Sequence, residues 1–158
     1  MQPVAIRSRK PRAPRIDHEG VEQMALIRWL YGEQQRGQSV GAFYEVIYHV
    51  PNGGQRNKKT AADLKRQGVK SGVSDLVVME GRGGWLGLYL EFKATPPKHA
   101  ATAPSQREWL EKADHRGYCA VLCRGLEEAK AVLREYASWE LTITPARIEM
   151  TLGSNWRG

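Results

Sequence analysis

Two apolar runs on either side of a glycine-rich turn constrain this chain most. Residues 76–79 read Leu-Val-Val-Met, residues 85–92 read Trp-Leu-Gly-Leu-Tyr-Leu-Glu-Phe, and Gly81-Arg82-Gly83-Gly84 lies between them. Runs of this composition around such a turn predict a β-hairpin. Both runs are apolar on each face, which is typical of central strands. The sequence therefore predicts an antiparallel pair of strands at the centre of a sheet.

Charged side chains stand at the open end of this hairpin. If the chain folds back about residue 83, Asp75 and Glu91 each lie eight positions from the turn and oppose each other. Opposed residues point to one face with Cβ atoms about 5 Å apart, and Lys93 shares that face because side chains alternate along a strand. Two such carboxylates repel unless a cation lies between them, and Mg²⁺ prefers oxygen ligands. The alternative is a surface ion pair between Glu91 and Lys93, contributing less than about 1 kcal/mol.

The composition favours one globular domain. The chain has 158 residues, enough for a single domain with a buried core. No stretch approaches the roughly 20 apolar residues of a membrane span, and the basic N-terminus lacks the apolar segment of a secretory signal. Cys119 and Cys123 stand about 13 Å apart along a predicted strand, too far for a disulfide. Reduced cysteines are typical of the cytosol, so we expect a cytoplasmic protein.

The net charge of +7 is concentrated at the N-terminus. Residues 1–16 contain three prolines, no acidic residue and five basic residues, which are Arg7, Arg9, Lys10, Arg12 and Arg15. This composition predicts a disordered basic arm that contacts phosphate backbones, with a solubilising tail as the alternative. We therefore expect an arm over residues 1–16 and a single domain over residues 17–158, of which residues 137–158 form an appendage that is hard to assign.

Helical and strand patterns alternate along the rest of the chain. The expected elements besides the hairpin are a helix over 18–31, a polar connection over 32–41, a strand over 42–50, a helix over 60–67, a helix over 105–116, a strand over 118–124 and a helix over 126–137. Asp17 suits the N-cap of the first helix, and Ser105 with Glu108 has capping-box spacing. This order predicts an α/β fold with a mixed central sheet flanked by helices.

The first helix supplies another acidic candidate for the charged end of the hairpin. Glu19 shares a stripe with Gln23, Leu26 and Leu30, so it is expected to point inward. The helical period also allows Glu22 to be the inward residue, and periodicity does not decide between the two.

Several motifs, read in order, resemble the VRR-NUC branch of the PD-(D/E)xK nuclease superfamily. The set Asp75…Glu91-Phe92-Lys93 is similar to the superfamily signature. The segments similar to the VRR-NUC branch are 50–56, 61–65, Gly68, 72–75, 87–93, Ser105-Gln106 and Gly117-Tyr118. The similarity covers about residues 19–137 and departs from the family at Ser74, where proline is usual.

The resemblance implies a restriction-endonuclease-like core and a metal-dependent endonuclease that hydrolyses phosphodiester bonds of DNA. It implies that Asp75, Glu91 and the Phe92 main-chain carbonyl bind Mg²⁺, for which Mn²⁺ can substitute. Glu19 then completes the metal site from the opposite side. The resemblance also implies that Lys93 is catalytic and that Gln106 lies near the active centre.

The resemblance also implies partners. It implies that stand-alone relatives of this length form homodimers that cut four-way DNA junctions. Such relatives come mostly from bacteriophages or their hosts. Branched DNA and a second copy of the chain are therefore the expected partners, in the cytoplasm of a bacterial or phage-infected cell. The alternatives are a general or restriction-type nuclease of ordinary duplex, and a non-catalytic DNA-binding protein that keeps the fold.

Basic and polar residues around the expected site are candidates for backbone contacts that do not read sequence. Besides the arm, these candidates are Asn52, Arg56, Lys58, Lys59 and Lys65. Asn52 and Arg56 flank a Gly-Gly turn, so turn formation is the first explanation for them and phosphate contact by Arg56 the second.

Overall fold

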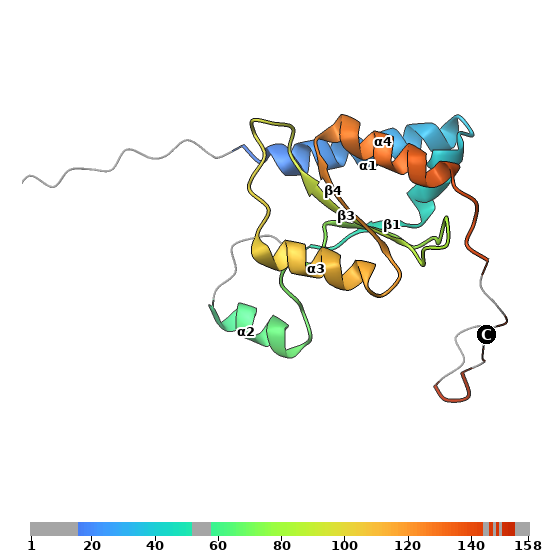
Figure 1. Cartoon of the computed structure of the whole chain (residues 1–158). Helices are drawn as coiled ribbons and strands as arrows, with labels where there is room; N and C mark the ends of the chain where they lie inside the picture. Colours follow the sequence, from blue (N-terminus) through green and yellow to red (C-terminus); the bar gives the residue numbers. More distant parts are fainter. Residues whose placement is uncertain (1–15, 52–57, 144–145, 147, 149, 154–158) are drawn as a thin grey trace, which may run out of the picture.

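The computed structural model describes residues 16–51, 58–143, 146, 148 and 150–153. The predicted arm, apart from Ile16, and the candidates Asn52 and Arg56 lie outside these residues. The elements in chain order are α1 (His18–Gln35), the 3-10 helix η1 (Ser39–Glu45), β1 (Ile47–His49), α2 (Lys58–Arg66), β2 (Leu76–Val78), β3 (Leu88–Lys93), α3 (Pro104–Asp114), β4 (Cys119–Arg124) and α4 (Leu126–Ser138) (Figure 1). None of the described helices is long and apolar enough to cross a membrane.

The strands form one mixed sheet in the order β1-β2-β3-β4. The β1–β2 and β2–β3 pairs are antiparallel, whereas β3 and β4 are parallel. Leu76 pairs with Leu90, which is the register predicted from the glycine turn. This confirms both the hairpin and the mixed sheet, and it brings Asp75, just before β2, level with Glu91.

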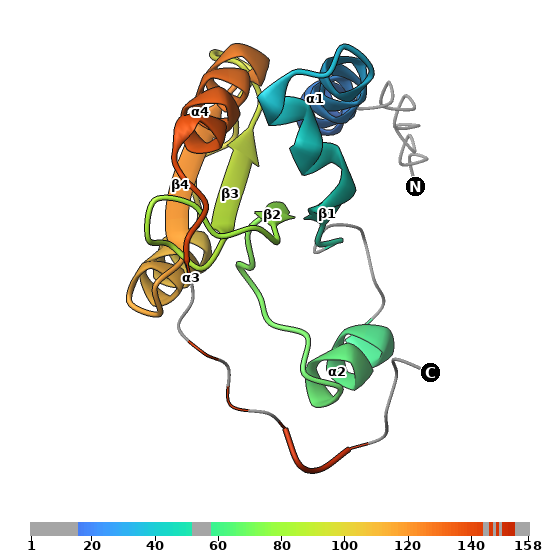
Figure 2. The same ribbon diagram turned by 90° about the vertical axis from the view of Figure 1, so that its right-hand side faces the viewer.

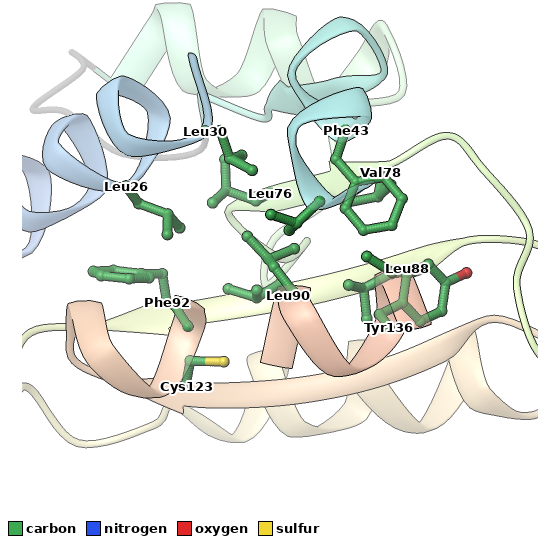
Figure 3. Close-up of a cluster of buried hydrophobic side chains, with 14 residues drawn as sticks. Leu26, Leu30, Phe43, Leu76, Val78, Leu88, Leu90, Phe92, Cys123 and Tyr136 are labelled. Atoms are coloured by element: carbon green, nitrogen blue, oxygen red, sulfur yellow. The ribbon is translucent and has the colours of Figure 1, made fainter. Parts of the chain in front are cut away.

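Helices cover the two faces of the sheet unequally. Helices α1 and α4 lie on one face and α3 on the other, where α3 connects the parallel strands β3 and β4 (Figures 1 and 2). The core lies between the sheet and the α1/α4 layer, with Leu26 and Leu30 of α1 packed toward the strands (Figure 3). On β3, Leu88, Leu90 and Phe92 point into this core. Because strand side chains alternate, Tyr89, Glu91 and Lys93 point to the α3 face.

The segment between α1 and β1 differs from the prediction. Helix α1 continues to Gln35, and the expected strand over 42–50 is reduced to Ile47–His49 because η1 occupies Ser39–Glu45. The buried residues Val40 and Phe43 explain the difference. Side chains three apart lie on one side of a 3-10 helix, whereas an odd spacing on a strand places them on opposite faces. The packing of both Val40 and Phe43 against the core therefore overrides the local strand propensity of this segment.

Helix α3 has its N-cap two residues before the predicted N-cap Ser105, so the predicted capping box is wrong. Its N-cap is Ala103, Pro104 occupies the first helical position, and Gln106 Oε1 accepts a hydrogen bond from the Ala103 N–H (2.8 Å). Proline is favoured at that position because it needs no N–H partner there. Gln106 lies in the first turn of α3, as predicted, over the charged end of the hairpin.

The chain after α4 returns to the hairpin turn. Arg82 forms an isolated bridge with Leu141, and Thr142 donates its N–H to the Gly81 carbonyl (2.9 Å). Arg82 Nη1 also donates to the carbonyls of Ala137 and Trp139 at the end of α4. The two short strands considered for residues 139–158 are therefore reduced, in the described part of this segment, to that one bridge.

Candidate active site

The hairpin brings Asp75, Glu91 and Lys93 together on the face that α3 covers. Asp75 Oδ2 accepts a hydrogen bond from the Phe92 N–H (2.9 Å), so its carboxylate is held across the strands toward β3. Lys93 Nζ donates to Glu91 Oε1 at 2.8 Å. The arrangement predicted from spacing is thus present in the fold, at the end of β3 farthest from the glycine turn.

Glu91 is the most deeply buried member of this group. Its side chain is 0% exposed, and its Oε1 accepts hydrogen bonds from Lys93 Nζ and from Gln106 Nε2 of α3. Its Oε2 is buried and has no partner among the described residues. Burial, together with the nearby charge of Asp75, raises the pKa of Glu91 to about 7, although Lys93 opposes this shift. A buried, unpartnered carboxylate oxygen of this kind calls for a cation or a proton.

Lys93 is 4% exposed and remains charged. Burial alone lowers the pKa of Lys93, but the hydrogen bond and charge of Glu91, followed by the charges of Glu19 and Asp75, raise it above the ordinary lysine value. Lys93 Nζ lies 3.8 Å from Glu19 Oε2 across the site. Burial is also the main reason that the pKa of Glu19 is raised. The ammonium group is therefore a fixed positive charge among three carboxylates.

The structure separates the roles of Glu19 and Glu22, which helical periodicity left open. Glu19 faces Lys93, whereas the Glu22 carboxylate accepts hydrogen bonds from Thr95 N–H (2.9 Å), Thr95 Oγ1 (2.7 Å) and Leu126 N–H (3.1 Å). Burial alone would raise the pKa of Glu22, but these hydrogen bonds lower it overall. Glu22 therefore joins α1 to the end of β3 and the start of α4, and Glu19 is the acid directed at the site.

Two supporting contacts were missed by sequence reasoning. His49 Nδ1–H donates to the Asp75 main-chain carbonyl (2.8 Å), and the same ring nitrogen lies 3.0 Å from the Gln23 side-chain amide. Gln23 is one helical turn after Glu19, so His49 lies between the helix that carries Glu19 and the segment that carries Asp75, with its Nδ1–H bonded to the Asp75 carbonyl. The stripe on α1 included Gln23, but a partner 26 residues away on β1 has no local sequence signal.

The donor set fits a hard divalent cation. Asp75 and Glu91 supply carboxylate oxygens, one of them unpartnered, and the Phe92 carbonyl is adjacent in the chain. Within the described ranges, no group of three or more His, Cys, Asp or Glu side chains is placed to hold an ion. An ion at this point would therefore rely on two carboxylates, main-chain oxygen and water, which suits Mg²⁺ because Mg²⁺ keeps several waters.

The DNA-contact candidates are only partly described. Lys65 lies in the last turn of α2 beside Arg66, and both are exposed. Figures 1 and 2 show α2 standing apart from the sheet and the other helices. Lys58 and Lys59 open α2, but their side chains lie outside the described part, as do Asn52, Arg56 and the five basic residues of the arm.

Comparison with known proteins agrees with this geometry. The family model described as "VRR-NUC domain" matches residues 18–127. A solved structure titled "VRR_NUC domain protein" is 28% identical, covers 78% of this chain and 90% of its own, and superposes with a TM-score of 0.62. No curated protein matches the chain significantly. Because the match includes α1, the whole sheet and α3, this chain belongs to the VRR-NUC domain family, which implies a nuclease-type function.

Proposed function

We propose that this protein is a metal-dependent DNA endonuclease that hydrolyses phosphodiester bonds, with branched DNA such as four-way junctions as its preferred substrate. The observation that carries the proposal is the buried group at the end of β3, where Asp75 and Glu91 oppose each other, Lys93 is fixed as a cation, and Glu91 Oε2 has no partner among the described residues. A structural ion pair between Glu91 and Lys93 alone would not require that orphaned oxygen.

Asp75, Glu91 and the Phe92 carbonyl would hold Mg²⁺, or Mn²⁺ in its place, and Glu19 would approach from α1. When bound, the ion would polarise the phosphate and lower the pKa of a water molecule. Lys93 is held by Glu91 in a water-poor site, where its ammonium group can donate to the attacking water and to the phosphate oxygens as negative charge develops. Gln106 fixes Glu91 Oε1, which leaves Oε2 for the cation.

Self-association is part of the proposal because a branched substrate with matching strands suits two symmetric sites. One face of α1 exposes three apolar side chains that support it, with Val21 at 55%, Met24 at 64% and Tyr31 at 48% exposed and Arg28 between the last two. Multi-angle light scattering of the purified chain would give a mass of twice 17.8 kDa for a dimer. A mass of one chain at micromolar concentration would contradict this part of the proposal alone.

A cleavage assay tests the catalytic proposal. Labelled linear duplex, flap and four-way-junction DNA are incubated with the protein in Mg²⁺, Mn²⁺ or EDTA. Cutting of junctions in either metal, and none in EDTA, is the expected result. Equal cutting of all substrates would instead indicate a general nuclease, and tight binding without cutting would indicate a non-catalytic DNA-binding protein.

Point variants locate the activity. Lys93→Ala and Asp75→Ala are expected to abolish cleavage while leaving DNA binding nearly intact, because neither side chain belongs to the α1/α4 core. Asp114→Ala is the matched control, since Asp114 is an exposed acid at the end of α3, away from the hairpin opening. Wild-type cleavage rates in both site variants would place the chemistry elsewhere.

A further inference from the structure

An aromatic pocket lies on the same face of the sheet as the candidate active site. Tyr89 is two residues before Glu91 on β3, about 7 Å along the strand and on the same side. On α3, Trp109 follows Gln106 by three residues and therefore continues the same helix face. The pocket has a volume of about 200 Å³ and is lined by Tyr89, Trp109, Lys112, Ala113, Arg116 and Tyr118.

The rings of this pocket meet edge to face. Tyr89 and Tyr118 have centroids 5.3 Å apart at 86°, and Tyr89 and Trp109 have centroids 6.4 Å apart at 62°. All three side chains are half-buried, so each keeps part of its ring at the surface. Trp109 Nε1 is buried with no hydrogen-bond partner in the described part of the chain. Ring packing therefore holds Trp109, with no polar anchor.

Two positive charges stand at the rim of the pocket without acidic partners. Lys112 and Arg116 are exposed and four residues apart, and the Arg116 guanidinium donates to the Lys112 main-chain carbonyl (3.3 Å). Neither side chain forms an ion pair with any residue that the structure describes. Like charges at this spacing are unfavourable by themselves. Their position beside exposed ring surface suits a ligand that combines a flat ring with negative charge.

We propose that this pocket binds an unpaired nucleobase of the DNA substrate, while Lys112 and Arg116 hold the adjoining phosphates. The inference rests on the proposed endonuclease function and deepens it. Aromatic side chains accept any base by stacking, and basic side chains follow the strand. Lys112 is six residues beyond Gln106, about 9 Å along α3, so the bound nucleotide lies a few positions from the phosphate that is cut. A base is cheapest to take out of the stack where it is mismatched or already single-stranded, so this pocket would favour DNA whose pairing is interrupted over a continuous duplex.

The test compares binding of two DNA probes to the full chain carrying Lys93→Ala, which is expected to bind without cutting. One probe is a fully paired duplex, and the other is the same duplex with a single unpaired nucleotide. The parent protein is expected to prefer the second probe. Tyr118→Leu removes a stacking surface and is expected to weaken binding of that probe by roughly five- to 150-fold, with little effect on the paired probe.

A second variant avoids any loss of packing. Lys112→Gln with Arg116→Gln changes only exposed side chains, and it is expected to reduce the slope of log K against log salt by about 1.4 for a single-stranded contact of two phosphates. The matched control is Arg36→Gln with Arg134→Gln, which removes two exposed charges from the layer of α1 and α4 on the opposite face of the sheet. The control is expected to keep the salt slope and the preference of the parent.

The possible outcomes test base binding in the pocket separately from DNA cleavage at the candidate active site. Loss of the preference in both pocket variants, with a normal control, supports the inference. Pocket variants that match the control overturn it, and the endonuclease proposal survives if the wild-type chain still cuts DNA. If the wild-type chain neither binds nor cuts any DNA, both proposals fall. Circular dichroism of Tyr118→Leu shows whether an effect in that variant comes from misfolding.

Discussion

Replacement of Gly72 by alanine is expected to damage the candidate site without replacing any of the site residues. Gly72 has a φ of +79°, and it approaches the start of α3 closely. A Cβ atom at Gly72 would lie 2.2 Å from the Ser105 carbonyl oxygen and 2.9 Å from the Gln106 backbone nitrogen. Because Gln106 holds Glu91, the loop that leads to Asp75 and the helix that holds Glu91 are fitted together at this glycine.

Gly68 provides a matched control for the backbone conformation. Gly68 also has positive φ, +95°, but a Cβ there would meet nothing within 4 Å. Alanine in this region costs about 1–2 kcal/mol in backbone strain, partly offset by a more restricted unfolded chain. Gly68→Ala should therefore lower the melting temperature by only about 2–6 °C in a domain of this size.

Gly72→Ala adds a collision to the same strain. Ordinary contacts of a Cβ begin near 3.4 Å, so the Ser105 backbone must move by more than about 1 Å, and Gln106 must move with it. A displacement of 1 Å in a group that positions a catalytic site can reduce rate about 100-fold. We therefore expect cleavage by Gly72→Ala to fall about 100-fold, and cleavage by Gly68→Ala to stay within about threefold of wild type.

Thermal unfolding and single-turnover cleavage of a four-way junction, measured for both variants, check this prediction. The comparison must be made well below both melting temperatures, so that unfolding does not imitate a loss of rate. If Gly72→Ala cuts as fast as Gly68→Ala, the close approach to Ser105 does not position Gln106, and Gln106 does not set the geometry of Glu91.

Four further variants or measurements address other parts of the structure. Glu22→Ala is expected to lose about 2 kcal/mol of stability near neutral pH. Because hydrogen bonds lower the pKa of Glu22, this stabilisation is complete above the unfolded pKa of 4.5 and disappears as the pH falls through the folded-state pKa. Acid unfolding of the wild type and of Glu22→Ala would show this dependence. Glu19→Gln should instead reduce cleavage with little change in stability. Burial raises the pKa of Cys123 to about 12, so mass spectrometry after alkylation near pH 8 should find Cys123 unmodified until denaturant is added. Ser74→Ala removes a buried hydroxyl that has no partner in the described residues and should raise the free energy of unfolding by up to about 1 kcal/mol, measured by urea titration.

The hairpin shows how far local sequence can predict a site. The glycine cluster sets the fold-back point, and the side-chain period of two then fixes which residues share a face. That reasoning placed Asp75 opposite Glu91 and put Lys93 beside them, and the strand register agrees. The strand predicted between α1 and β1 was largely wrong, because core packing places Val40 and Phe43 and local strand propensity does not include that packing.

The sequence by itself determined the paired carboxylates and the lysine, since strand alternation and a turn are short-range rules. The family resemblance named Glu19 and Gln106, but only the tertiary structure decided by which contacts they approach this group from the two helical layers. Glu19 rather than Glu22 faces Lys93 because packing of α1 on the sheet sets its rotation, and Gln106 reaches Glu91 because α3 starts at Pro104 against Gly72. Helix rotation and docking depend on contacts between residues far apart in the chain, and no local period records them.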